Sequence, residues 1–302
     1  MSHTTTYKYL DPEALSRLKN LSLAARQVVE GYFAGMHKSP HKGFSIEFAE
    51  HREYTPGVDP RHIDWRVLGR RDKLYVKQYE EETCLRCYLL VDKSASMGYK
   101  SEGMPLTKLE YASYMAASLA YLMAAQHDSA GLFTFDTTVR DCIPSRQGHG
   151  HLRVLMEKLE QAQPGGETTL SATFHELAES IKRRALIVVL SDLFDDPAAL
   201  LGALQHFRHK KHEVIVFQVL DPAEVTFPFD DITRIEDMEN HREVTSDPRA
   251  FRKAYLDELA KFLDTIRNGC RSALIDYTVA PTDQRFDLFL GTYLARRQAM
   301  NS

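Results

Sequence analysis

The second part of the chain alternates between short, largely apolar runs and segments with helical periodicity. Each apolar run has the length of a strand and little polar alternation, which is typical of strands buried on both faces of a sheet. Because a helical segment fills every gap between these runs, we expect an α/β fold, doubly wound, with a mainly parallel sheet and helices on both faces. The expected strands are Leu85–Val91, Ala130–Phe135, Ala185–Leu190, Glu213–Val219 and Ala273–Val279.

The sequence contains signals that predict several helix boundaries. Thr107-x-x-Glu110 is a capping box and predicts that a helix starts directly after Thr107. Asp196-Pro197 and Asp247-Pro248 each combine a capping residue with a proline at the first helical position. We expect Gly269 to end the helix that starts at Pro248.

The first 82 residues have a different pattern. Asp11-Pro12-Glu13 predicts the start of a helical arm that ends near Gly35. Residues 44–82 contain short extended runs, with Leu74-Tyr75-Val76 as a strand, and predict a small β-rich extension. We therefore divide the chain into an extension of residues 1–82 and an α/β domain of residues 83–302, in which residues 221–243 resemble an insertion with short strands.

Composition excludes some classes of protein. The chain has 302 residues, a net charge of -4, 43% hydrophobic and 26% charged residues, which does not favour a nucleic-acid binder. The N-terminal residues lack the apolar core of a secretory signal, and the most apolar helical stretch is too short for a membrane span. Four scattered cysteines indicate no disulfide scaffold, so we expect a reducing cytoplasmic location.

Oxygen-bearing side chains lie in three loops of the expected α/β domain. Asp92, Ser94 and Ser96 follow the first strand, Thr168 follows a Gly-Gly pair, and Asp192 follows the central strand. Ligands of open parallel sheets bind beyond the carboxyl ends of the strands, where these loops would meet. Carboxylate and hydroxyl oxygens suit Mg²⁺ or Mn²⁺, so we expect one divalent cation there. An open position on that ion would attract the carboxylate of an acidic partner protein.

Asp-x-Ser-x-Ser at 92–96, Gly-Gly-x-Thr at 165–168 and the third-loop Asp192 resemble the metal-ion-dependent adhesion site of von Willebrand factor type A domains. The segments Pro56–Arg66 and Lys73–Glu82 extend this resemblance to the bacterial family called domain of unknown function fifty-eight, often encoded beside MoxR-type AAA+ ATPases. The resemblance implies a noncatalytic partner or adaptor of such an ATPase in the assembly or maturation of protein complexes.

Two residues depart from the adhesion-site pattern. Lys93 places a cation inside the motif, where it would repel a metal ion if its side chain reached the site. Asp192 is followed by Leu193 where a glycine is often found. The sequence leaves open where Lys93 points.

Asp64, Trp65 and Arg66 form a candidate docking surface, because an aromatic residue beside charges is typical of interface anchors. Packing of the extension onto the sheet is the alternative explanation of Trp65.

Two enzymatic alternatives remain. Asp92 at a strand end is also the position of the nucleophile in a Mg²⁺-dependent phosphohydrolase, although Ser94 stands where such enzymes usually have a second aspartate. A serine hydrolase would need His175 or His212 as its base, and no Gly-x-Ser-x-Gly motif surrounds Ser94 or Ser96.

Other polar residues have simpler structural explanations. Asp136 and Asp221 follow predicted strands as turn formers and are left out of the site. His149-Gly-His151 is expected in a solvated loop before a helix that starts at Leu152, and Cys84-x-x-Cys87 lacks the second pair of a zinc site.

Overall fold

A computed structural model describes residues 8–11, 46–53, 74–81, 85–166, 169–229, 233–236, 243–246 and 248–301. The chain divides into two compact units, one of residues 36–84 and one that joins residues 1–35 to residues 85–302. Each unit is described by itself. The division of the chain into an extension and an α/β domain at residue 83 stays a prediction.

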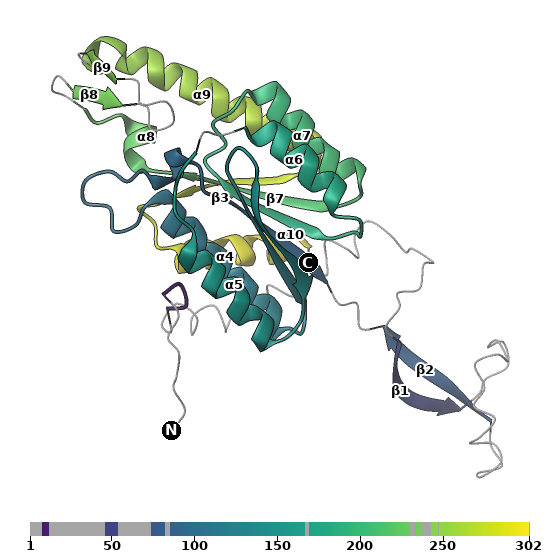
Figure 1. The fold of residues 1–302 in the computed structure, drawn as a ribbon. Coiled ribbons are helices and arrows are strands. Elements are labelled where there is room, and N and C mark those ends of the chain that lie inside the picture. Colours follow the sequence, from purple (N-terminus) through teal and green to yellow (C-terminus); the bar gives the residue numbers. More distant parts are fainter. Residues whose placement is uncertain are drawn as a thin grey trace, which may run out of the picture. The chain divides into compact units, whose positions relative to one another are not determined.

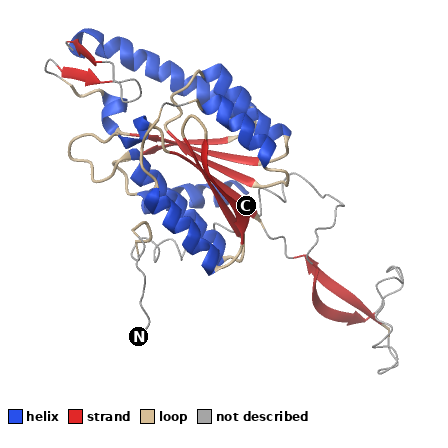
Figure 2. Ribbon diagram, in the orientation of Figure 1, coloured by secondary structure: helices blue, strands red, loops and turns tan. Residues whose placement is uncertain are grey.

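The larger unit is built on a six-stranded sheet (Figures 1 and 2). The first five strands in the order below are parallel and the last is antiparallel to its neighbour. This arrangement confirms the expected α/β, doubly wound fold. The order is β10 (Asp276–Pro281), β7 (Glu213–Leu220), β6 (Leu186–Ser191), β3 (Arg86–Asp92), β4 (Ser129–Phe135) and β5 (Val139–Arg146).

The chain order of the strands reverses between β3 and β6. From β3 the chain goes to β4 and β5 on one side, and then returns to β6, β7 and β10 on the other. This reversal is the topological switch point, where the loops after two neighbouring strands separate and leave room for a ligand. The loops that contain Asp92 and Asp192 leave the sheet at this point.

The strands in the middle of the sheet are the ones that sequence pattern predicted best. Every residue of β4, β6 and β7 is buried, which explains their unbroken apolar character. The expected strand from Ala273 was placed too early: the preceding helix continues to Ser272, and a turn with Leu274 at φ 55° separates it from β10.

Strand β5 was not predicted. Its residues alternate between half-buried and exposed, because β5 lies at the edge of the sheet. Pro144 cannot donate a ladder hydrogen bond, which suits an edge strand.

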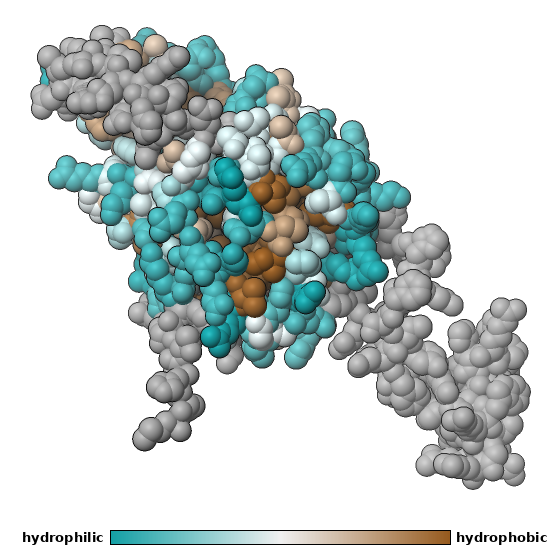
Figure 3. Space-filling view, in the orientation of Figure 1, coloured by the Kyte–Doolittle hydropathy of each residue, from teal (hydrophilic) through white to brown (hydrophobic). Residues whose placement is uncertain are grey.

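Figure 3 shows the face of the molecule that is turned to the viewer in Figure 1. Apolar residues gather there between the two helical layers, and polar residues surround them.

Helices cover both faces of the sheet, and each face has its own apolar core. One core is shared with α4 (Lys108–Ala125), α5 (His149–Gln161) and α10 (Phe286–Asn301). The other is shared with α6 (Leu170–Ser180), α7 (Pro197–His209) and α9 (Pro248–Ser272). Figure 1 shows α4 and α5 on one side of the sheet and α6, α7 and α9 on the other.

The helix starts follow the capping signals. The Thr107 hydroxyl accepts the Glu110 amide proton, and the Glu110 carboxylate accepts that of Thr107, which confirms the capping box. Asp196 caps α7 through the Ala199 amide at 2.8 Å. Helix α9 begins at Pro248, as predicted.

One predicted helix end and one predicted helix start were wrong. Gly269 lies inside α9, where a Cβ atom would come within 2.3 Å of Leu201 on α7; the glycine allows close packing of two helices and does not end one. Helix α5 starts at His149, three residues before the expected Leu152, because Gly148 at φ 100° takes the position that precedes the first turn.

Short elements complete the described residues. Helix α8 (Pro222–Thr226) and β8 (Thr233–Glu236) lie in the segment 221–243 that was expected to carry short strands. The antiparallel partner of β8, β9 (Glu243–Ser246), begins at the last residue of that segment and extends beyond it. In the smaller unit, β1 (Ile46–Glu53) and β2 (Tyr75–Glu81) pair antiparallel, as a β-rich extension requires. The helix expected between Asp11 and Gly35 lies outside the described residues. Among the helices that the structure describes, none combines the length and apolarity that crossing a membrane needs.

Candidate metal site at the carboxyl edge of the sheet

Asp92 ends β3 and is completely buried. Its Oδ1 accepts the Ser94 amide proton at 2.8 Å, and its Oδ2 accepts the Ser191 hydroxyl proton at 2.5 Å. Burial and the nearby charge of Asp192 raise the pKa of Asp92 to about 7, although the hydrogen bonds from Ser191 and Ser94 act in the opposite direction. The two aspartates of the predicted site are therefore close enough to repel each other.

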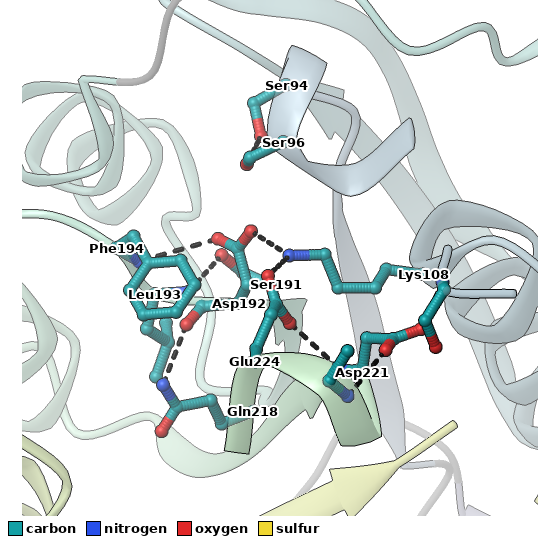
Figure 4. A network of polar contacts seen from close by, with 12 residues as sticks. Ser94, Ser96, Lys108, Ser191, Asp192, Leu193, Phe194, Gln218, Asp221 and Glu224 are labelled. Carbon is teal, nitrogen blue, oxygen red and sulfur yellow. Dashed lines mark hydrogen bonds and ion pairs between the residues drawn. The ribbon is translucent and has the colours of Figure 1, made fainter. Parts of the chain in front are cut away.

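Ser94 and Ser96 are held together by the short 3-10 helix η2 (Ala95–Gly98). Their hydroxyl oxygens are 3.1 Å apart, Ser94 is buried and Ser96 is half-buried. In Figure 4 both hydroxyls lie on the side of η2 that faces the Asp192 carboxylate. The tight turn thus brings two hydroxyl oxygens together, while their role as metal ligands stays a prediction.

The Gly-Gly loop lies against the first loop. The Gly165 amide donates to the Lys93 carbonyl at 2.9 Å, and the Ala95 amide donates to the Gly166 carbonyl at 3.0 Å. Gly166 has φ 81°, and a Cβ atom there would lie 3.3 Å from Asp136. Both the backbone conformation and the close approach favour glycine. Thr168 lies outside the described residues, so its part in the site stays a prediction.

Asp192 follows β6 and is almost fully buried. Its Oδ2 lies 2.8 Å from the Lys108 ammonium, and its Oδ1 accepts the Phe194 amide proton at 3.4 Å (Figure 4). The Gln218 side chain of β7 donates to the Asp192 carbonyl at 2.7 Å. The third loop is thus fixed by its backbone, while the Asp192 carboxylate faces a cation that the sequence motifs did not include.

Leu193 stands where the adhesion-site pattern often has a glycine. It is a fully buried residue with φ 62°, in the left-handed region that β-carbon-bearing residues avoid. Its amide donates to the Ser191 hydroxyl at 2.9 Å. The backbone here takes the conformation that glycine adopts most easily, and Leu193 reaches it at a cost in strain.

Lys108 is the main residue that sequence reasoning missed. Its side chain is fully buried, and its ammonium lies 2.8 Å from Asp192 and 2.6 Å from Glu224 of α8. Burial lowers the pKa of Lys108, but the charges of Asp192 and Glu224 outweigh burial, so the pKa is raised. A lysine in the first turn of a helix opposes the helix dipole, and that local conflict was the available signal.

Lys93, the cation inside the Asp92–Ser96 motif, is half-buried and contributes to the electrostatics of the neighbouring edge strand. The pKa of Asp141 on β5 is lowered: burial opposes the shift, while hydrogen bonds from Thr134 and Lys158 and the charge of Lys93 outweigh it. The charge of Lys93 thus contributes to lowering the pKa of Asp141 on the edge strand β5.

The charges of the site fit a hard divalent cation. Asp192 and Glu224 share the ammonium of Lys108, and the buried carboxylate of Asp92 lies close enough to Asp192 to be affected by its charge. Burial raises the pKa of Glu224 as well, even though Lys108 acts against this. Two positive charges beside Asp92 and Asp192 would relieve their repulsion and satisfy oxygens that suit Mg²⁺.

The aspartates that were left out of the site have structural partners. Asp136 accepts hydrogen bonds from the Arg140 guanidinium at 2.7 Å and from the Thr138 amide at 3.2 Å. Asp221 caps α8 through the Ala223 amide and also accepts the Ser101 amide proton at 2.9 Å. Both are turn or cap residues, as predicted.

Two histidines that a serine hydrolase would need are used elsewhere. His212 is buried beside the start of β6, where its ring contacts the Ala185 amide and the Ile181 carbonyl. His175 of α6 pairs with His206 of α7 at 2.9 Å. In the described residues neither ring therefore serves Ser94 or Ser96.

Of the remaining candidate residues, some have structural roles and others lie outside the described residues. His151 contacts the Ala130 carbonyl through Nε2 at 2.9 Å, and Cys87 is buried in β3. Cys84 and the proposed docking residues Asp64, Trp65 and Arg66 lie outside the described residues, so the docking surface stays a prediction.

The sequence matches the model of a family described as "Protein of unknown function DUF58" over residues 50–262, which is more than half of the chain. The chain belongs to the DUF58 family. Two mycobacterial proteins are similar to this DUF58 chain: uncharacterized protein Mb1516 of Mycobacterium bovis and uncharacterized protein Rv1480 of Mycobacterium tuberculosis. Each is 29% identical over 273 residues, which cover 88% of this chain and 84% of the relative.

Solved structures give a more distant likeness to the DUF58 chain. The conserved hypothetical protein BatB of Bacteroides thetaiotaomicron is 14% identical with a TM-score of 0.47, over 71% of this chain and 99% of BatB. The SpRpn10 VWA domain is 12% identical with a TM-score of 0.40, over 69% of this chain and 94% of that domain. Both scores are below 0.5, so the doubly wound fold rests on the strand order of the sheet itself.

Proposed function

We propose that this DUF58 chain is a noncatalytic protein-interaction module that depends on one divalent cation, Mg²⁺ or Mn²⁺. The residues proposed to hold the ion are Asp92, Ser94, Ser96, Thr168 and Asp192. The observation that carries the proposal is the excess of buried carboxylates over cations at the switch point of the sheet.

The ion would supply a positive centre in a loop cluster that is otherwise acidic. Only two of its proposed ligands, Asp92 and Asp192, are carboxylates, so a carboxylate from outside can compete with water for an open position. The chain's own residues orient that position: Ser191 holds Asp92, and Gln218 holds the Asp192 backbone. The proposed partner surface is therefore acidic.

We further propose that the partner is a MoxR-type AAA+ ATPase, together with a client that presents a carboxylate. Membership of the DUF58 family supports this, because the sequence resembles family members often encoded beside such ATPases. The role would be that of an adaptor in assembly or maturation of protein complexes, in the cytoplasm.

The phosphohydrolase alternative is less well supported. A nucleophilic Asp92 needs a free, ionised oxygen that can reach a phosphorus atom. The hydrogen bonds and burial of Asp92 bear on this alternative and on the metal site alike, so what disfavours the alternative is Ser94, which stands where such enzymes usually have a second aspartate.

The proposal is tested by co-purifying the full chain with the MoxR-type ATPase of the same genome, in Mg²⁺ and in EDTA. The expected result is a complex in Mg²⁺ that EDTA dissociates and that Asp92→Ala prevents. The matched control is Asp128→Asn, because Asp128 accepts the Leu85 amide proton at the opposite end of β3. A complex that survives EDTA and Asp92→Ala would contradict the proposal.

A further inference from the structure

We propose that Lys108 is a built-in competitor of the metal ion: its ammonium holds Asp192 until a divalent cation takes over that carboxylate. This inference rests on the proposed metal site and names the residue that sets its affinity. The contact that carries it is the 2.8 Å ion pair between Lys108 and Asp192, which are separated by 84 positions in the chain (Figure 4).

The position of Lys108 is costly by itself. The side chain is fully buried, and it belongs to the first turn of α4, where the helix dipole disfavours a positive charge. Thr107 already completes the cap of this helix through Glu110, so Lys108 is not needed for capping. The carboxylates of Asp192 and Glu224, which contact the Lys108 ammonium, offset this cost.

Glu224 gives Lys108 a partner that does not depend on the metal. Its Oε1 lies 2.6 Å from the ammonium, while its Oε2 accepts the Asp221 amide proton at 2.8 Å. The Glu224 carbonyl also accepts the Tyr255 hydroxyl proton at 2.9 Å. Glu224 is thus anchored to α8 and α9, and it can retain the Lys108 charge when Asp192 turns to an ion.

The competition has a direct consequence for affinity. An ion that binds Asp192 has to displace Lys108 from Oδ2, or bind Oδ1 against the repulsion of the nearby ammonium, so part of its binding free energy is lost in either case. Removing the ammonium should therefore tighten metal binding. The same removal also changes the net charge, and the test has to separate the two effects.

A double variant separates them. Lys108→Met/Glu224→Gln removes one positive and one negative charge, so the net charge of the pair is unchanged while Asp192 is released. Lys93→Met is the charge control for the single variant, because it removes one cation of the Asp92–Ser96 motif, whose charge contributes at Asp141.

The experiment is a calorimetric Mg²⁺ titration of the full-length wild type, Lys108→Met, the double variant and Lys93→Met, with circular dichroism to verify folding. We expect Lys108→Met to bind Mg²⁺ about tenfold or more tightly than the wild type, since it removes a like charge that lies 2.8 Å from the Asp192 carboxylate. The double variant should bind several-fold more tightly, and Lys93→Met should differ by less than about threefold, because Lys93 is only partly buried and its charge is partly screened by solvent.

The outcomes distinguish the two proposals. If the wild type binds Mg²⁺ and the double variant binds it equally tightly, the competitor role of Lys108 is overturned and the metal site stays in place. Absence of Mg²⁺ binding in all four folded proteins overturns the metal site and the competitor role together. If Lys108→Met alone does not fold, the double variant, which buries no unpaired Glu224 charge, decides the question.

Discussion

The Ser191 hydroxyl donates a hydrogen bond to Asp92 Oδ2 at 2.5 Å and so joins β6 to β3 across the switch point of the sheet. The same hydroxyl accepts the Leu193 amide proton at 2.9 Å. One serine side chain therefore links the first and third loops of the candidate site. Sequence reasoning did not identify Ser191, although it directly precedes Asp192.

Replacing Ser191 by alanine should leave both of its partners unsatisfied inside the protein. We expect Ser191→Ala to lower the free energy of unfolding by about 1–3 kcal/mol, measured by urea denaturation. Ser180→Ala is the control, because Ser180 donates to a carbonyl near the end of α6, away from the site, and should cost within about 0.5 kcal/mol. Equal costs for the two variants would show that the Ser191 link is unimportant.

The left-handed backbone of Leu193 makes an unusual prediction about alanine and glycine. At most helix or strand positions glycine is less stable than alanine, by about 0.5–1 kcal/mol. At φ 62° alanine keeps the strain and glycine relieves it, while both lose the buried leucine side chain. Leu193→Gly should thus unfold at the same or a higher urea concentration than Leu193→Ala; the opposite order would contradict this assignment of strain.

The packing of α9 on α7 depends on Gly269. A Cβ atom at this position would lie 2.3 Å from Leu201 Cδ1 and 3.0 Å from Leu201 Cγ, so Gly269→Ala should destabilise the protein by about 1–2 kcal/mol. Gly202 lies on α7 beside Leu201, and a Cβ atom there meets nothing within 4 Å. Gly202→Ala should therefore stabilise the protein by about 0.5–1 kcal/mol, since alanine favours a helix. Thermal unfolding of the two variants should give shifts of opposite sign, and shifts of the same sign would refute the close-packing role.

Buried His212 should make the protein less stable in mild acid. Its Nδ1 accepts the Ala185 amide proton and its Nε2 donates to the Ile181 carbonyl, so the contacts require the neutral ring. Burial lowers the pKa of His212 below its usual value of about 6.5. Below that pH the unfolded chain binds a proton that the folded protein does not, so the free energy of unfolding falls as the pH falls.

The measurement is urea denaturation at several pH values between about 5 and 8 for the wild type and His212→Asn. The loss of stability in acid should be smaller in His212→Asn than in the wild type. Identical pH profiles for the two proteins would contradict the buried neutral ring.

The elements that sequence pattern predicted well are those governed by local rules. The strands in the middle of the sheet must be apolar because they are buried on both faces, and α4 and α7 have their capping signals directly before them. Strand β5 escaped prediction because an edge strand needs neither continuous apolar residues nor the absence of proline.

The candidate site was only partly readable for a related reason. Asp92, Ser94 and Ser96 form a local motif, and Asp192 follows a recognisable strand. Ser191 and Lys108 act through partners 99 and 84 positions away, and Glu224 reaches Lys108 from a short helix in a segment with no evident role in the sequence. Such pairs become visible only when the sheet order brings their loops together.

The central claim is tested most directly by calorimetric titration of the full chain with Mg²⁺ and Mn²⁺, comparing the wild type with Asp92→Ala and with the control Asp128→Asn, all verified as folded by circular dichroism. The account predicts that the wild type and Asp128→Asn bind one ion and that Asp92→Ala binds none. A wild type that binds no ion, or an Asp92→Ala variant that binds as tightly as the wild type, would contradict it.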